Sequence, residues 1–76
     1  MDVVFPPVSV KEPEAQGVVG TWFVLDGEPV TEGQLIAEVQ VDKVSSDLHA
    51  PATGHLWHAV SEGEGTQQGA VIAIIE

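Results

Sequence analysis

The 76-residue sequence contains no cysteine. Disulfides and cysteine-based metal or redox sites are therefore excluded, and any thiol chemistry has to come from an attached group. Basic side chains are also scarce: Lys11 and Lys43 stand against twelve aspartates and glutamates, which gives a formal net charge of −10. Such a chain is repelled by nucleic acid and by anionic membranes. We expect a basic protein partner instead.

The sequence also lacks a long apolar run. It has no stretch of about 18 apolar residues that would form a transmembrane helix, and Met1-Asp2 does not begin a signal peptide. Together with the absence of cysteine, this favours a cytoplasmic location and no contact with a membrane. The length predicts a single domain over residues 1–76, with a small core and little reserve of stability.

Apolar and polar residues alternate on both sides of Asp42-Lys43. The inward positions are odd before this pair and even after it: Leu35, Ala37, Val39 and Val41, then Val44, Ser46 and Leu48. Period-two alternation is typical of strands, and a very short antiparallel turn requires this change of parity if one face is to stay apolar. The pattern therefore predicts a β-hairpin with Lys43 at its tip.

No stretch shows helical apolar spacing with capping residues, so we predict an all-β fold. Further strands are expected over residues 2–5, 18–24 and 71–75, the last of them within the core. The stretch from Val8 to Gln16 has neither period and predicts an exposed loop. Trp22 and Phe23 are interpreted as core and edge packing rather than as a ligand platform.

The second half of the chain repeats the first at a shift of 36 residues. The shift superimposes Gly27, Glu28, Gly33, Ile36 and Ala37 on Gly63, Glu64, Gly69, Ile72 and Ala73. Internal repetition of this kind predicts two sheets related by a pseudo-two-fold axis. The position equivalent to the Lys43 turn then lies past the end of the sequence, so we expect Met1 and Glu76 at the end of the domain opposite the lysine.

The residues form no recognisable catalytic or metal-binding pattern. Ser45 and Ser46 adjoin Lys43, but no acid or histidine is placed to complete a triad, and neighbouring strand residues point to opposite faces. The histidines lack the spacing of a zinc site: His49, His55 and His58. We therefore expect a domain that is neither an enzyme nor a metal protein. An exposed lysine on a flexible stem is instead suited to carrying a covalently attached group.

The hairpin sequence Glu38 to Leu48, followed by Ala50 to Gly54, resembles the lipoyl-lysine motif of lipoyl domains from 2-oxo acid dehydrogenase complexes. The resemblance continues through Val4-Phe5-Pro6, Gly17 to Val30, Gly33-Gln34-Leu35 and Gly69. It implies a biotinyl/lipoyl-attachment domain, folded as a flattened barrel-sandwich of two small antiparallel sheets, with lipoic acid attached covalently to Lys43.

The same resemblance implies roles for residues near the lysine. Asp42 and Val44 would be flanking recognition residues, and the preceding loop would contact partners through Val8, Glu12, Glu14 and Gln16; the alternative for this loop is a plain connector. Some positions depart from the family pattern, namely Gln16 for a glutamate, Gly20 for a β-branched residue and Ser45-Ser46 for a Thr-Val pair. These departures bear on partner specificity and leave the expected fold unchanged.

The implied function is that of a swinging-arm carrier. A lipoate ligase or an octanoyl/lipoyl transferase would attach the lipoyl group, which would take an acyl group from a thiamine-diphosphate-dependent 2-oxo acid decarboxylase and pass it to coenzyme A at an acyltransferase core. Dihydrolipoamide dehydrogenase would then reoxidise it. Two alternatives stay open. A biotin carrier has the same type of hairpin but typically methionine on both sides of the lysine, and an unmodified adaptor would keep the fold without the cargo.

Overall fold

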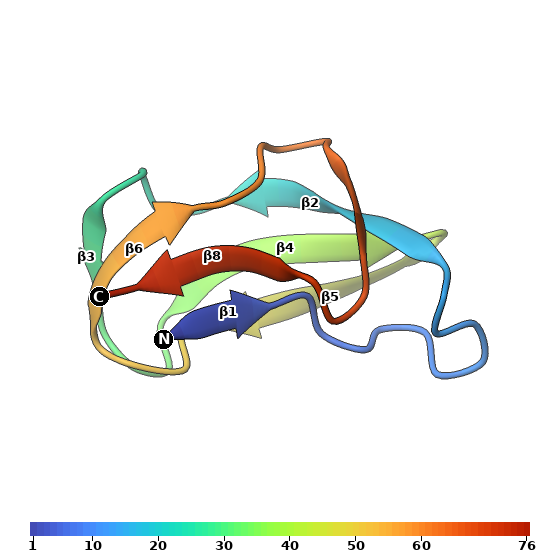
Figure 1. Ribbon diagram of the computed structural model, residues 1–76, viewed down its shortest axis with the longest axis horizontal. Helices are drawn as coiled ribbons and strands as arrows, with labels where there is room; N and C mark the ends of the chain where they lie inside the picture. The colour runs from blue at the N-terminus through green and yellow to red at the C-terminus, as the bar shows by residue number, and fades with distance from the viewer.

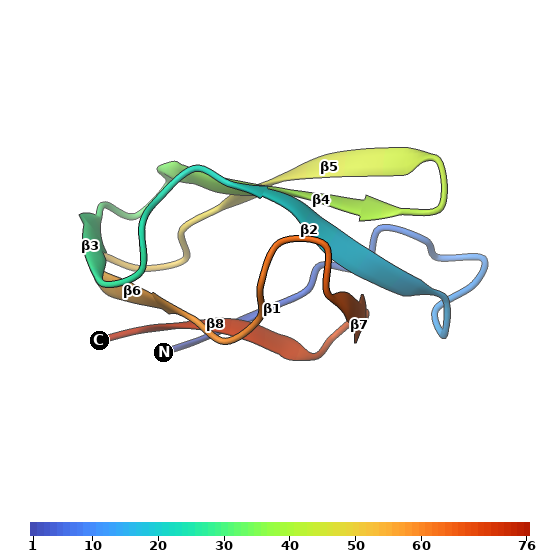
Figure 2. The same ribbon diagram turned by 90° about the horizontal axis from the view of Figure 1, so that it is seen from above.

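The computed structural model describes all of residues 1–76. It contains eight β-strands, joined by turns and loops, and no helix. The strands are β1 (Asp2–Val4), β2 (Gln16–Trp22), β3 (Glu28–Val30), β4 (Leu35–Val41), β5 (Val44–His49), β6 (Gly54–His58), β7 (Gly65–Gln67) and β8 (Val71–Ile75). They form two four-stranded antiparallel sheets, sheet A in the order β1-β8-β6-β3 and sheet B in the order β5-β4-β2-β7 (Figures 1 and 2). The predicted all-β fold of two small sheets is confirmed. None of its elements is a helix long and apolar enough to cross a membrane.

Strands β4 and β5 form the predicted hairpin. The last pair of their ladder is Val41 with Val44, which leaves Asp42 and Lys43 as a two-residue turn. Val39 and Val41 are buried on the inner side of β4, in agreement with the alternation in the sequence. Leu35 and Val44, which the alternation placed on the inward side, are exposed, the former beside a register shift between β4 and β5. No residue of β5 is buried, so β4 anchors the hairpin in the core while β5 lies at the edge of sheet B.

The two sheets follow the predicted pseudo-two-fold symmetry. At a shift of 36 residues β2, β3 and β4 correspond to β6, β7 and β8, and β5 takes the edge position in sheet B that β1 takes in sheet A. The turns repeat in their hydrogen bonds: the N–H of Glu28 donates to the Leu25 carbonyl, and the N–H of Glu64 donates to the Ser61 carbonyl, at 3.0 and 3.1 Å. Both halves therefore fold around the same local framework.

Glycine occupies the corners of both halves because the backbone there has positive φ. The angles are 82° at Gly27, 79° at Gly63, 88° at Gly33 and 87° at Gly69. Residues with a Cβ adopt this region only with strain. The predicted equivalence of Gly27 and Gly63 is confirmed. Gly20, in contrast, lies at a register shift between β2 and β4, where a bulge removes the need for a β-branched residue.

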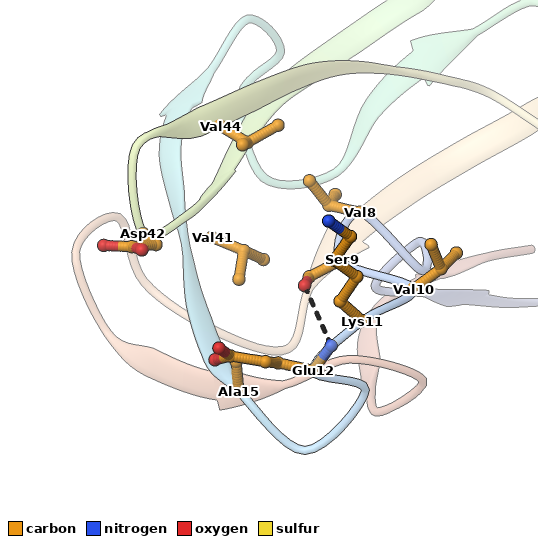
Figure 3. Close-up of a pocket in the computed structure, with 9 residues that line it drawn as sticks. All are labelled: Val8, Ser9, Val10, Lys11, Glu12, Ala15, Val41, Asp42 and Val44. Atoms are coloured by element: carbon orange, nitrogen blue, oxygen red, sulfur yellow. Dashed lines mark hydrogen bonds between the residues drawn. The ribbon is translucent and has the colours of Figure 1, made fainter.

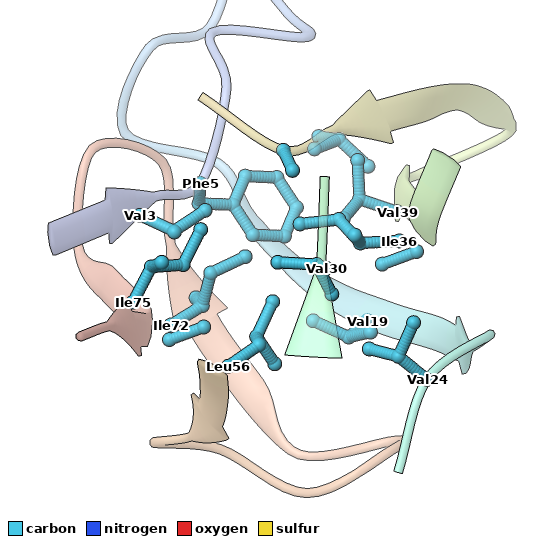
Figure 4. Close-up of a cluster of buried hydrophobic side chains, with 14 residues drawn as sticks. Val3, Phe5, Val19, Val24, Val30, Ile36, Val39, Leu56, Ile72 and Ile75 are labelled. Carbon is cyan, nitrogen blue, oxygen red and sulfur yellow. The ribbon is translucent and has the colours of Figure 1, made fainter. Parts of the chain in front are cut away.

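The core lies between the sheets and consists of 14 apolar residues (Figure 4). β8 contributes Ile72, Ala73 and Ile75 to it, whereas Val71 and Ile74 face outward, so the prediction of a core strand holds for its inward side only. Two successive residues are buried because the register with β1 shifts at this point.

Trp22 and Phe23 were predicted to pack in the core or at its edge. This prediction is right for Trp22 and wrong for Phe23. Trp22 packs against the core, but Phe23 is 53% exposed. The reason is that β2 ends at Trp22, two residues earlier than predicted, and the chain bends before the buried Val24.

Both termini lie at the end of the molecule opposite the β4–β5 turn, as predicted (Figures 1 and 2). The amino group of Met1 donates a hydrogen bond to the Ile75 carbonyl at 2.6 Å, which joins the two chain ends in sheet A. The hairpin tip is thus free of the terminal segments.

Candidate functional site

Lys43 is exposed on the two-residue turn between β4 and β5. Its neighbour Asp42 has a φ of 56° and is the only non-glycine residue with positive φ in the chain. Aspartate tolerates this region better than most residues, and the two-residue hairpin turns that match strand twist need positive φ at their first position. Asp42 therefore supplies the backbone conformation that places Lys43 at the tip.

The fold leaves the lysine accessible. Asp42, Lys43 and Val44 are all exposed, and the turn projects from the end of sheet B in Figure 2. The four-carbon stem of a lysine carries its amine away from the backbone, so an enzyme can acylate it without opening a strand. These residues fit a group attached to Lys43 through an amide bond.

The loop between β1 and β2 lies beside this hairpin (Figure 3). Between the two is a cleft of about 320 Å³, here called the loop cleft, lined by Val8, Ser9, Val10, Lys11, Glu12 and Ala15 of the loop and by Val41, Asp42 and Val44 of the hairpin. Valine side chains from both segments line it, with the charged groups of Lys11, Glu12 and Asp42 among them. The loop therefore lies beside Asp42 and Val44, the two residues that flank Lys43.

The four predicted contact residues do not lie together. Val8 and Glu12 line the loop cleft, whereas Glu14 is exposed on the loop outside the residues that line it. Gln16 is the first residue of β2, because it pairs with Gln67 of β7, and the loop therefore ends one residue earlier than predicted. A contact role for these residues stays a prediction.

The loop is fastened by Gln68, a residue that the sequence alone does not single out. Its side-chain oxygen accepts a hydrogen bond from the Ser9 N–H at 2.8 Å, and its amide nitrogen donates to the carbonyls of Glu12 and Ala15, each at 3.1 Å. A glutamine side chain offers both an acceptor and two donors, which is what this arrangement uses. No local pattern signals it, since its partners lie more than fifty positions away.

The histidines do not gather into a site. His49 and His55 are exposed, and His58 stacks on Trp22 with ring centroids 4.2 Å apart and an interplanar angle of 13°. The Nε2 atom of His58 lies 3.0 Å from the Val24 carbonyl oxygen. No group of three or more His, Cys, Asp or Glu residues is placed to hold a metal ion. The stacked pair links β2 to β6, one strand from each sheet.

The molecule is thus a small two-sheet domain that holds one exposed lysine on a tight two-residue turn. Comparison with known proteins identifies the family. The chain belongs to the biotin/lipoyl family, described as biotin-requiring enzyme, which it matches over residues 3–76.

Its relatives include acyltransferase components. The chain is 38% identical over 61 residues to the dihydrolipoyllysine-residue acetyltransferase component of the acetoin cleaving system of Bacillus subtilis (79% of this chain, 15% of the relative). It is 35% identical over 66 residues to the lipoamide acyltransferase component of the branched-chain alpha-keto acid dehydrogenase complex of the same organism (86% and 16%). A third relative, the succinyltransferase component of the 2-oxoglutarate dehydrogenase complex of Azotobacter vinelandii, is 36% identical over 59 residues (76% and 15%).

The resemblance to lipoyl domains is therefore confirmed. The chain spans only 15 to 16% of the length of these three relatives, so it corresponds to a small part of each.

Proposed function

We propose that this domain carries lipoic acid in amide linkage on Lys43 and moves acyl groups, as a swinging arm, between the active sites of a complex that oxidises a 2-oxo acid or a related substrate. The observation that carries the proposal is the exposed lysine on a two-residue turn, in a chain similar to lipoyl-bearing acyltransferase components. The attached lipoyl group would supply the dithiolane that takes up and releases acyl groups. The protein would supply presentation and recognition.

The residues around the lysine have separate tasks in this proposal. Asp42 holds the turn, and the anchored strands keep the amine at a fixed point for a lipoate ligase or an octanoyl/lipoyl transferase. The acidic surface and the loop cleft favour a basic partner surface. The partners would be the decarboxylase, the acyltransferase core and dihydrolipoamide dehydrogenase in the cytoplasm, and tethering raises the local concentration of the carried group at each of them.

Biotin is the alternative cargo, because the matched family covers both groups. The residues beside the lysine are Asp42 and Val44 rather than methionines, and the relatives named above are lipoyl-bearing components. Both observations favour lipoic acid. An adaptor that carries nothing would have no need of an unobstructed lysine at the tip.

The proposal predicts that the lipoylated domain is a better acyl acceptor than free lipoamide. With the cognate decarboxylase its kcat/KM should exceed that of lipoamide by about tenfold or more, because the protein surface adds binding energy and orients the arm. The advantage should shrink as salt rises, since exposed charges are screened over about 10 Å at 0.1 M ionic strength. Initial rates at several salt concentrations measure both effects. No advantage with decarboxylases of any 2-oxo acid class would leave the adaptor as the better account.

A further inference from the structure

The outer faces of the two sheets differ in character although their positions correspond. In each sheet, three residues that are cross-strand partners on neighbouring strands form a row across the outer face. The row is Thr21, Glu38 and Asp47 in sheet B, and Trp57, Ile74 and Asp2 at the equivalent positions of sheet A. Two polar positions of sheet B are thus a tryptophan and an isoleucine in sheet A.

Trp57 and Ile74 belong to a set of four exposed apolar side chains on the outer face of sheet A, here called the apolar face. It consists of Val4, Trp57, Val71 and Ile74, which are 47%, 45%, 41% and 38% exposed. Val4 pairs with Val71 and Trp57 pairs with Ile74, so each pair places two apolar side chains beside each other on neighbouring strands. Outward-facing positions of a small soluble sheet are ordinarily polar, and exposed apolar side chains gathered on one sheet face mark an interaction surface.

The fold itself does not require Trp57 and Ile74, because sheet B has the same strand order and carries threonine and glutamate at the equivalent positions. Leu35, the equivalent of Val71, is apolar and 39% exposed as well, so the contrast between the sheets rests on Trp57 and Ile74. Trp57 has one local task, because its ring lies against the turn at Gly27, where an added Cβ would come within 2.9 Å of the ring atoms. That contact leaves nearly half of Trp57 exposed, and it does not explain why an isoleucine occupies the exposed position 74.

The charges around the apolar face indicate what covers it. Asp2 adjoins Ile74 in the row, and Glu76 follows Ile75 at the end of the same sheet. Both lysines lie elsewhere, Lys11 on the loop and Lys43 on the hairpin of sheet B. A second copy would bring another chain of net charge −10 against this one, which is unfavourable. A partner with an apolar centre and a lysine- or arginine-rich rim is complementary in both respects.

We propose that the apolar face docks such a surface on one protein component of the acyl-transfer complex. The identity of the complex rests on the proposed function. The position suits this role because the face lies on sheet A, whereas the β4–β5 turn that carries Lys43 belongs to sheet B and lies at the end of the molecule away from the termini (Figure 2). A component bound here would hold the domain in place while the arm remained free to enter an active site.

The test uses a variant in which sheet A receives the residues of sheet B, Trp57→Thr with Ile74→Glu. Ile74→Glu alone is the second variant, since it leaves the contact between Trp57 and Gly27 intact. Gln40→Glu is the matched control, because it adds the same charge to the outer face of sheet B. The ¹⁵N-labelled lipoylated domain is titrated separately with the decarboxylase, the acyltransferase core and dihydrolipoamide dehydrogenase. The backbone amide signals of β1, β6 and β8, which the variants retain, are followed by NMR.

We expect one component to shift or broaden these signals, with a Kd that both variants raise about tenfold or more and that the control changes less than about twofold. The proposal is overturned if no component perturbs these signals, if the variants bind as tightly as the unchanged domain, or if sedimentation shows that the face is buried in a dimer. Lipoylation of each variant, measured by intact mass, separates this failure from failure of the proposed function, since loading of Lys43 does not involve the apolar face.

Discussion

The chemistry assigned to this domain depends on one residue and on the neighbour that positions it. Lys43 is one of only two basic side chains, and the alternation on both sides of it places it on a turn without knowledge of the structure. The alternation does not show that Asp42 has a positive φ. Aspartate tolerates this conformation, but its presence in a sequence does not predict it. The turn was therefore predictable from the sequence, and its conformation was not.

Exchange of Asp42 and Lys43 tests whether the position of the amine matters. The double variant Asp42→Lys, Lys43→Asp moves the amine by one residue, which turns it toward the other side of the turn and places a lysine at positive φ. Lipoylation by a lipoate ligase should fall about tenfold or more, with about 1 kcal/mol lost from the free energy of unfolding. Timed intact-mass measurements and thermal melting follow these quantities.

Asp42→Gly is the control for this exchange. Glycine keeps the positive φ without strain, so the variant should be lipoylated at close to the rate of the unchanged domain when Asp42 acts through its backbone. A rate as low as that of the exchanged variant would show that the ligase recognises the Asp42 carboxylate. Equal lipoylation of the exchanged variant would mean that exposure of an amine is sufficient and that its position in the hairpin is not recognised.

At the scale of elements, the site is a hairpin with a loop fastened beside it. The hairpin follows from period-two alternation and was predictable as an element. The conformation of the loop was not, because it depends on Gln68, which reaches Ser9 and Ala15 from the corner between β7 and β8. Hydrogen bonds between distant segments leave no periodic signal in a sequence.

Removing the Gln68 side chain should loosen the loop without affecting the hairpin. In Gln68→Ala the three hydrogen bonds to the loop are lost, so the Ser9 amide should exchange with solvent faster. The KM for the decarboxylase should rise about threefold to tenfold at a nearly unchanged kcat, because a disordered loop has to be ordered on binding. Lipoylation of Lys43 should stay as it was.

Glu32→Ala is the matched variant, since Glu32 is equivalent to Gln68 under the 36-residue shift and lies far from the loop. It should change neither hydrogen exchange at Ser9 nor the KM. If Gln68→Ala accelerated exchange at Ser9 and left the KM unaltered, the loop would be a connector rather than a contact surface.

At the scale of the whole molecule, the repeat in the sequence was the most informative feature. The matching glycines and Ile-Ala pairs indicated two related sheets and placed the termini away from Lys43, and the structure confirms both. The repeat did not predict how the sheets differ. Trp57 and Ile74 face outward, although residues 71–75 were predicted to lie within the core and the repeat places Thr21 and Glu38 at the equivalent positions.

The symmetry predicts that Gly27 and Gly63 are both needed, and the structure predicts that they are not needed equally. Gly63→Ala meets only the strain of positive φ, about 1 to 2 kcal/mol, since no atom lies within 4 Å of the added Cβ. Gly27→Ala has the same strain and must also displace the Trp57 ring. We expect melting temperature to fall by about 4 to 8 °C for each kcal/mol in a domain of this size, and further for Gly27.

Gly65→Ala is the control in these melting experiments. Its φ is not positive, and the added Cβ would lie 3.5 Å from the side-chain oxygen of Gln16, an ordinary contact. Little change is expected. Unchanged melting in all three variants would remove the argument that the two glycine corners are strained equivalents.

Attachment of lipoic acid to Lys43 is tested by the mass of the domain after co-expression with a lipoate ligase and, separately, with a biotin ligase. We predict the mass increase of one lipoyl group with the first enzyme, located by peptide mapping to the peptide that contains Lys43 and absent in Lys43→Arg, and no increase with the second. Modification of Lys11, attachment of biotin to Lys43, or no modification by the lipoate ligase would contradict the account.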